Sequence, residues 1–196
     1  MRVTIHQPEH FPYMGFFQKV SSADHFIVLD NVKFRKNYFQ NRNKIRNRSG
    51  HDEWITVPVE SDSDSKAINE VRTARDPSWR RKVLKKIQEN LGFDATEIYE
   101  GESLIEINMR SIAWSMNRLG IDRPITHASH LRASGTKSEL LANIVRKVGG
   151  TTYISGPSGR EYLDLSYFEG IAVEFFEPQV ENHYSSLYNI LTRGQV

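Results

Sequence analysis

The segment that most constrains the fold is His25–Asp30, with the sequence HFIVLD. A continuous apolar run of this length that ends in a carboxylate is typical of a strand buried on both faces of a parallel sheet. Arg2–Gln7 has the pattern of a shorter strand, which Pro8 ends because proline has no backbone N–H for a sheet ladder. With a short helix at Gly15–Val20, these strands predict a right-handed β-α-β unit whose two strand ends share one sheet edge.

Apolar strands and amphipathic helices alternate through the rest of the chain. Further strands are predicted at Trp54–Val59, Ile125–Leu131, Thr151–Ser155 and Ala172–Phe176, and helices at 77–91, 102–119, 136–148 and 185–192. Thr136 and Glu139 have the spacing of a capping box. His127 and His130 fall on one predicted strand and are expected on opposite faces. The pattern predicts an α/β protein: a single domain over residues 1–196, with a mostly parallel, Rossmann-like sheet flanked by helices.

Composition limits the possible classes of protein. A length of 196 residues fits one domain, and 38% apolar with 26% charged residues is ordinary for a soluble protein. No run approaches the roughly 18 apolar residues of a membrane helix, so no membrane insertion is expected. The chain has no cysteine, which excludes disulfides and thiolate metal sites and favours a cytoplasmic location. Because the histidines are scattered, we expect no metal site, and no motif calls for a cofactor.

His6 is the first candidate catalytic residue. Val3 and Ile5 are expected to face one side of their strand, which leaves His6 on the other side at the carboxyl end. An imidazole there can act as a general base or a hydrogen-bond donor near pH 7; the alternative is a hydrogen-bonded core histidine. Gln7, beside it, can bind a substrate amide or hydroxyl. Asp30, at the same predicted edge, is the second catalytic candidate.

A basic segment follows the second strand. Residues 33–48 contain seven lysines and arginines and no acidic residue. Arg42 in the expected loop can bind carboxylate or phosphate through two parallel hydrogen bonds, with an ordinary basic loop as the alternative. We expect substrate binding by Lys33, Asn41, Arg42 and Lys44. Because the net charge is only +2, this local imbalance favours an anionic small molecule over a polyanion.

A glycine-containing turn follows the predicted strand that ends at Ser155. Gly156–Gly159 lets the backbone approach a ligand closely, and N–H groups in such a turn can bind phosphate or carboxylate oxygens. Tyr162 and Asp164 add polar side chains just beyond it. The candidate substrate-binding residues here are Ser155, Gly156, Tyr162 and Asp164.

Several motifs together resemble the WbqC-like family. They are His6-Gln7-Pro8, Pro12-x-x-Gly15-x-Phe17-x-Lys19, Ala23-Asp24-x-Phe26, Leu29-Asp30, Asn41-Arg42-x-x-Ile45, Trp54-x-Thr56-Val57-Pro58-Val59, Tyr153-Ile154-Ser155-Gly156 and Tyr162-Leu163-Asp164. The resemblance covers nearly the whole chain. It implies a role in surface-polysaccharide biosynthesis of the O-antigen type, with a nucleotide-linked or lipid-linked sugar as substrate. The chain departs from the family at Tyr188 or Asn189, where an Asp is expected.

The leading hypothesis is therefore an enzyme, a transferase that moves an acyl or aminoacyl group onto a nucleotide-linked amino sugar. In it His6 deprotonates the acceptor, while Arg42 and Lys44 bind phosphate or carboxylate. We expect the Arg42 loop and the Ser155–Gly159 turn to converge on His6 and Asp30.

Two alternatives remain open. One is a nucleotidyltransferase-like enzyme of HxGH-type fold, although the segment His6–His10 does not reproduce that motif. The other is a non-catalytic nucleic-acid-binding module in which residues 33–48 contact phosphates while Phe34, Tyr38 and Phe39 stack on bases. The small net charge makes nucleic acid the weaker expectation.

Overall fold

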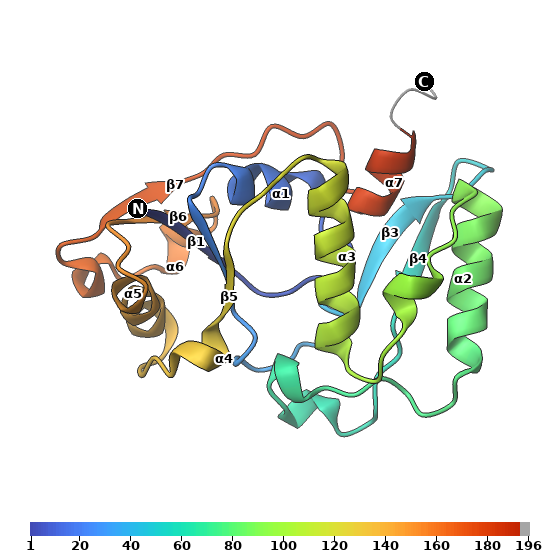
Figure 1. Cartoon of the computed structure of the whole chain (residues 1–196), viewed down its shortest axis with the longest axis horizontal. Helices are drawn as coiled ribbons and strands as arrows, with labels where there is room; N and C mark the ends of the chain where they lie inside the picture. The colour runs from blue at the N-terminus through green and yellow to red at the C-terminus, as the bar shows by residue number, and fades with distance from the viewer. Residues whose placement is uncertain (193–196) are drawn as a thin grey trace. The chain divides into compact units, whose positions relative to one another are not determined.

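The computed structural model describes residues 1–192, which form two compact units (Figure 1). The sheet unit comprises residues 1–7, 15–30 and 121–179. The ribbon unit comprises residues 8–14, 31–120 and 180–192. That the whole chain folds as one domain stays a prediction.

The sheet unit is built on five parallel strands in the order β5-β2-β1-β6-β7 (Figure 1). Their bounds are β1 Arg2–His6, β2 His25–Val28, β5 Ile125–His127, β6 Thr152–Ser155 and β7 Ala172–Phe175. This sheet confirms the predicted α/β class and the Rossmann-like parallel arrangement. The central strand is β1, and β2 lies directly beside it.

Short helices cover both faces of this sheet. They are α1 Met14–Ser21, α4 Ala128–Leu131, α5 Lys137–Lys147 and α6 Gly159–Tyr162, with a 3-10 helix at Leu165–Phe168. Phe16 of α1 packs edge to face on Phe26 of β2, with ring centroids 5.5 Å apart. Phe168 stacks on Tyr153 of β6 at 5.4 Å. Since Tyr153 pairs in register with Val3 and Phe26 with Thr4, these aromatic contacts lie on opposite faces.

The strand register brings two histidines into one row of the sheet. His6 of β1 pairs with Val28 of β2, and Val28 pairs with His127 of β5. Register partners in parallel strands direct their side chains to the same face. His6 and His127 therefore lie on one face of the sheet, at the carboxyl ends of strands that flank β2.

Two local expectations for this unit are wrong. The strand predicted over Ile125–Leu131 ends at His127, and the next four residues form the helical turn α4. His127 and His130 consequently do not point apart: their ring centroids are 5.5 Å apart. The predicted capping box also fails, because Thr136 makes no side-chain capping hydrogen bond at the start of α5.

The ribbon unit is built on an antiparallel pair of strands, β3 Arg42–Arg46 and β4 Asp52–Thr56. Its helices are α2 Ser78–Leu91, α3 Leu104–Arg118 and α7 Ser186–Thr192, with 3-10 helices at Ser63–Ser65, Ile68–Glu70 and Thr96–Tyr99. Helices α2, α3 and α7 were all predicted. The loop expected around Arg42 is wrong, because Arg42 begins strand β3 and pairs with Thr56.

An apolar stripe buries one long helix of the ribbon unit in its core, and capping residues set the helix boundaries. On α2 the side chains of Trp79, Val83 and Ile87 recur on one helical stripe and are buried in that core. Gly92 ends α2 in the left-handed conformation, with φ of 65°. Ser103 caps α3 by accepting from the backbone N–H of Glu106. Within residues 1–192, no helix is long and apolar enough to cross a membrane.

Candidate functional site at the carboxyl edge of the parallel sheet

Asp30 lies just beyond the carboxyl end of β2, where it is the centre of a hydrogen-bonded group in the sheet unit. Its buried carboxylate accepts from the backbone N–H of Ser129 at 2.9 Å and from the Ser129 hydroxyl at 2.8 Å. It also accepts from Nδ1 of His127 at 2.8 Å. His127 ends β5 and Ser129 lies in the helical turn α4 that follows directly, so the junction of these two elements brings both residues to the carboxylate.

These contacts fix the charge of Asp30. Burial acts to raise the pKa of the Asp30 carboxyl, but the hydrogen bonds from His127 and Ser129 outweigh it, so the pKa is lowered. The carboxylate is therefore ionised near pH 7. Because an ionised carboxylate can only accept hydrogen bonds, Nδ1 of His127 carries the proton.

His127 then has the arrangement of a general base. With the proton on Nδ1, the neutral ring has its lone pair on Nε2. The side chain is 27% exposed, so the imidazole is accessible as well as oriented. A carboxylate that holds the imidazole in one tautomer also stabilises the imidazolium that forms when Nε2 accepts a proton.

His6 occupies a different environment in the same unit. Its Nδ1 donates to the backbone carbonyl of Gln7 at 2.9 Å, and its ring packs edge to face on Phe16 at 4.8 Å. Burial and the nearby charge of Lys19 lower the pKa of His6 to about 3, against the opposing effect of the Gln7 hydrogen bond. His6 is therefore neutral near pH 7. It is a weak base, and its Nε2 is suited to accepting a hydrogen bond.

The turn after β6 has the close packing that glycine permits. A Cβ on Gly159 would lie 2.1 Å from Oγ of the buried Ser155, so a side chain cannot be accommodated there. A Cβ on Gly156 would meet no atom within 4 Å. Packing explains Gly159, whereas the open space at Gly156 leaves its backbone accessible to a ligand.

The two polar candidates beyond this turn differ. Tyr162 is exposed, and the burial of part of its side chain raises the pKa of its hydroxyl. Asp164 caps the following 3-10 helix by accepting from the N–H of Ser166 at 3.0 Å and its hydroxyl at 2.6 Å. Capping accounts for Asp164 without a ligand, so Tyr162 is the stronger candidate for substrate contact.

In the ribbon unit, Arg42 and Lys44 lie on the same face of β3 as Trp54 of β4. The guanidinium of Arg42 lies 4.2 Å from the Trp54 ring, and Nζ of Lys44 lies 5.2 Å from it. Lys44 also pairs with Asp52 at 2.7 Å. Nε of Arg42 is buried and has no hydrogen-bond partner within residues 1–192. Arg42 is thus positioned by the Trp54 ring, and it makes no ion pair within residues 1–192.

Asn41 and Lys33 have mainly structural surroundings in that unit. The amide of Asn41 is buried; it accepts from the N–H of Asn37 at 3.0 Å and donates to the carbonyl of Val57 at 3.1 Å. Lys33 is exposed, and its backbone pairs with Ala67. Of the four residues predicted from the basic segment, Arg42 is therefore the best placed to bind an anion.

The structure weakens the basis of both alternative functions. Phe34, one of the rings expected to stack on bases, is buried in the core of the ribbon unit. His10 is the second histidine of the segment that was compared with the HxGH motif. It is buried in the ribbon unit too, with Nε2 2.8 Å from the Tyr99 hydroxyl. It is a core histidine hydrogen-bonded to a core tyrosine.

The sheet unit thus brings together two predicted residues, His6 and Asp30, at the ends of adjacent strands. The partners of Asp30, His127 and Ser129, were missed by sequence reasoning. The signal was partial, because the strand predicted over Ile125–Leu131 contains His127 but does not end there; only the structure places His127 at the carboxyl end of β5. The convergence of Arg42 on this edge stays a prediction. Within residues 1–192, no group of three or more histidine or carboxylate side chains could hold a metal ion.

The fold and this site define an α/β protein with a carboxylate–imidazole pair at the carboxyl edge of a parallel sheet. A sequence profile of the WbqC-like protein family matches residues 7–192, and the chain belongs to this family. It is similar to the uncharacterized protein Rv1507c of Mycobacterium tuberculosis, with 27% identity over 201 residues that cover 95% of this chain and 87% of the relative. No solved structure matches.

Proposed function

We propose that this protein is a transferase of surface-polysaccharide biosynthesis that moves an acyl or aminoacyl group onto the amino group of a nucleotide-linked amino sugar. The observation that supports catalysis is the 2.8 Å hydrogen bond between Nδ1 of His127 and the buried carboxylate of Asp30. The polysaccharide context rests on the resemblance of the chain to its family. A cytoplasmic location, which the absence of cysteine favours, is part of the same proposal.

In this mechanism the amine of the acceptor sugar attacks the carbonyl carbon of the donor. A C–N bond forms, the bond from the carbonyl carbon to the leaving group breaks, and Nε2 of His127 takes the proton from nitrogen. Asp30 stabilises the resulting imidazolium, which returns the proton to the leaving group. Neutral His6 accepts a hydrogen bond from the substrate through Nε2 and holds it in place.

Substrate binding is assigned to the remaining polar candidates. Gln7, Ser155 and Tyr162 supply hydrogen bonds to the sugar or to the transferred carbonyl group, and the backbone at Gly156 is open to a ligand. Arg42, with Lys33 and Lys44 from the same basic segment, is proposed to bind phosphate or carboxylate. The proposed substrate is thus an anionic small molecule, and the chemistry needs no metal or cofactor.

The test is to incubate the purified protein with nucleotide-linked amino sugars and with acyl and aminoacyl donors, and to follow the acceptor by mass spectrometry. We expect the acceptor to gain the mass of the acyl group. His127→Asn should lower kcat/KM by about 100-fold or more, because general-base catalysis typically contributes 100- to 10,000-fold. His25→Asn is the matched control, since His25 lies at the amino end of β2 and contacts Thr126 at 2.9 Å.

Full activity of His127→Asn would overturn the assigned base, and wild-type activity of His6→Ala would remove His6 from the mechanism. Release of pyrophosphate from ATP or CTP without acyl transfer would contradict the proposal and favour the nucleotidyltransferase alternative.

A further inference from the structure

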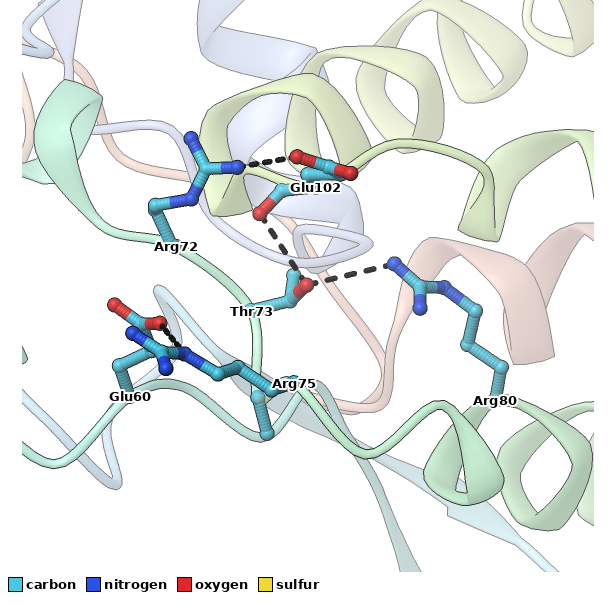
Figure 2. A pocket seen from close by; sticks show the side chains of 7 residues that line it. Glu60, Arg72, Thr73, Arg75, Arg80 and Glu102 are labelled. Carbon is cyan, nitrogen blue, oxygen red and sulfur yellow. Dashed lines mark hydrogen bonds and ion pairs between the residues drawn. The ribbon is translucent and has the colours of Figure 1, made fainter.

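The ribbon unit contains a pocket of about 420 Å³ that the proposed mechanism does not use (Figure 2). Its lining is largely polar and includes three arginines and two glutamates: Arg72, Arg75, Arg80, Glu60 and Glu102, with Thr73 and Ala74. All of these residues lie between β4 and the start of α3. Their charges sum to +1, so the lining favours an anion of modest charge.

Arg80 is held in this pocket entirely by neutral groups. Its Nε donates to the carbonyl of Tyr99 at 3.0 Å, and its Nη2 donates to the carbonyl of Gly101. The same Nη2 lies 3.4 Å from the hydroxyl of Thr73, a contact drawn in Figure 2. Within residues 1–192 Arg80 makes no ion pair, so its guanidinium is fixed in place while its charge is uncompensated by a carboxylate.

Arg72 and Arg75 are instead paired with carboxylates at the rim. Arg72 contacts Glu102, and Arg75 contacts Glu60 at 3.0 Å (Figure 2). The side chain of Arg75 is 92% exposed, and ion pairs so exposed are worth only about 0 to 1 kcal/mol. Glu60 also lies 3.8 Å from Nζ of Lys66 and would still have a cationic partner if Arg75 turned to a ligand.

The starts of two long helices lie at this pocket, and each is already capped by a carboxylate: Asp76 accepts from the N–H of Ser78 at 2.9 Å, and Glu106 accepts from the N–H of Ser103 at 3.2 Å. Arg80 lies in the first turn of the 14-residue helix α2, and Glu102 directly precedes Ser103, the N-cap of the 15-residue helix α3. Because these carboxylates already use the partial positive charge of the helix N-termini, the attraction for an anion comes from the arginines. A neighbouring hollow of about 560 Å³ shares Glu60, Ala74 and Arg75 with the pocket and offers space for the rest of a ligand.

We propose that this pocket binds the phosphate group of a small polar molecule. Arg80 is the fixed anchor, and Arg72 and Arg75 move from their glutamates to close on the phosphate. Guanidinium groups match phosphate oxygens through parallel hydrogen bonds, and several of them suit a phosphate better than a single carboxylate. The carboxylates released at the rim can accept hydrogen bonds from ligand hydroxyls. The residues of this pocket all belong to the ribbon unit, and the proposal does not depend on the proposed transferase activity.

The test is isothermal titration of the full chain with inorganic phosphate and with ribose 5-phosphate. We expect saturable binding of at least one probe; tighter binding of the ester would identify an organic phosphate, and equal binding would identify free phosphate. Arg80→Gln should weaken binding about 10-fold or more, equal to about 1.4 kcal/mol. Arg75→Gln should weaken it about 3-fold. Arg81→Gln, an exposed neighbour on α2 that does not line the pocket, should leave it unchanged.

Absence of saturable binding by the wild-type chain to both probes would overturn the proposal. Equal weakening by Arg81→Gln and Arg80→Gln would also overturn it, because it would indicate a general charge effect. If circular dichroism shows that Arg80→Gln does not fold, the binding affinity of Arg75→Gln tests the proposal instead, because the exposed side chain of Arg75 has no packing role. Unchanged affinity in that variant would then overturn the proposal.

Discussion

The two units hold a charged group in place by the same means and with opposite sign. In the sheet unit, Asp30 is fixed by donors from His127 and Ser129, and its negative charge supports a base. In the ribbon unit, Arg80 is fixed by backbone carbonyls, and its positive charge stays available to an anion. Hydrogen bonds to neutral groups orient a charged side chain without neutralising it. Both the carboxylate that supports a base and the arginine that binds an anion need such an oriented charge.

The largest effect should come from breaking the charged pair of the sheet unit. Asp30→Asn preserves shape but replaces an acceptor with an amide that no longer selects the tautomer of His127 or stabilises its imidazolium. We expect kcat/KM for acyl transfer to fall by about 1,000-fold, within the range typical of general acid–base catalysis. Steady-state kinetics with an acceptor that gains the acyl mass in the mass-spectrometric assay measures this loss.

Asp24→Asn is the matched control for that substitution. Asp24 directly precedes β2, whereas Asp30 follows it, and its carboxylate accepts from the backbone N–H of Arg2 at 2.7 Å. Activity should change less than about 3-fold, because the lost contact is an exposed one. Equal losses in the two variants would show that Asp30 acts on the stability of β2 and not on the base.

The next largest effect concerns the two cores. Ile27 in the sheet unit and Ile55 in the ribbon unit are both fully buried. Each Ile→Ala substitution should lower the free energy of unfolding by about 3 kcal/mol, from lost apolar burial and the cavity left behind. Urea unfolding measures the loss. Hydrogen exchange should show the greater loss of amide protection in the unit that carries the substitution; the same pattern for both variants would contradict two separate cores.

Sequence reasoning predicted the sheet unit better than the ribbon unit, for a physical reason. The apolar run of β2 is buried on both faces, so its pattern is unambiguous. In β3 the alternation is hidden because Asn43 is buried beside Ile45 and hydrogen-bonds the carbonyl of Phe11 at 2.8 Å. The buried asparagine and the outward-facing arginines together give β3 a continuous polar sequence, which predicts a loop.

The candidate sites show the same limit. Asp30 could be found because the end of one strand marks it, but the length of β5 had to be known before His127 became its partner. The arginine pocket joins Glu60, Arg80 and Glu102, which no single motif connects. Local patterns predict strand ends, whereas a pocket assembled from distant turns needs the tertiary structure.

A smaller effect is expected from pH, and it tests whether the units respond alike. Burial lowers the pKa of His6 in the sheet unit and of His10 in the ribbon unit to about 3. Between pH 6.5 and 3 the unfolded chain binds protons that the folded chain does not, so stability falls as pH falls. Each histidine should contribute up to about 1.4 kcal/mol per pH unit over that window.

Urea unfolding at pH 7, 6 and 5 measures that slope. His6→Gln and His10→Gln should each make it less steep, because the substituted amide does not titrate. Each single variant is the control for the other. A slope unchanged by either substitution would show that the folded chain protonates the histidine, and that its ring is less buried than the structure indicates.

The smallest effect concerns Trp54, which lies 4.2 Å from the guanidinium of Arg42. Such cation–π contacts are worth about 0.5 to 1 kcal/mol at partly exposed sites, so a double-mutant cycle of Trp54→Leu and Arg42→Gln should give coupling of that size in urea unfolding. Lys44→Gln, at the longer distance of 5.2 Å, should couple more weakly. Zero coupling would mean that Arg42 moves freely, as in the loop expected from sequence. Measured coupling would instead show that Arg42 resembles Arg80: its guanidinium is held by a neutral group, and its charge stays available to an anion.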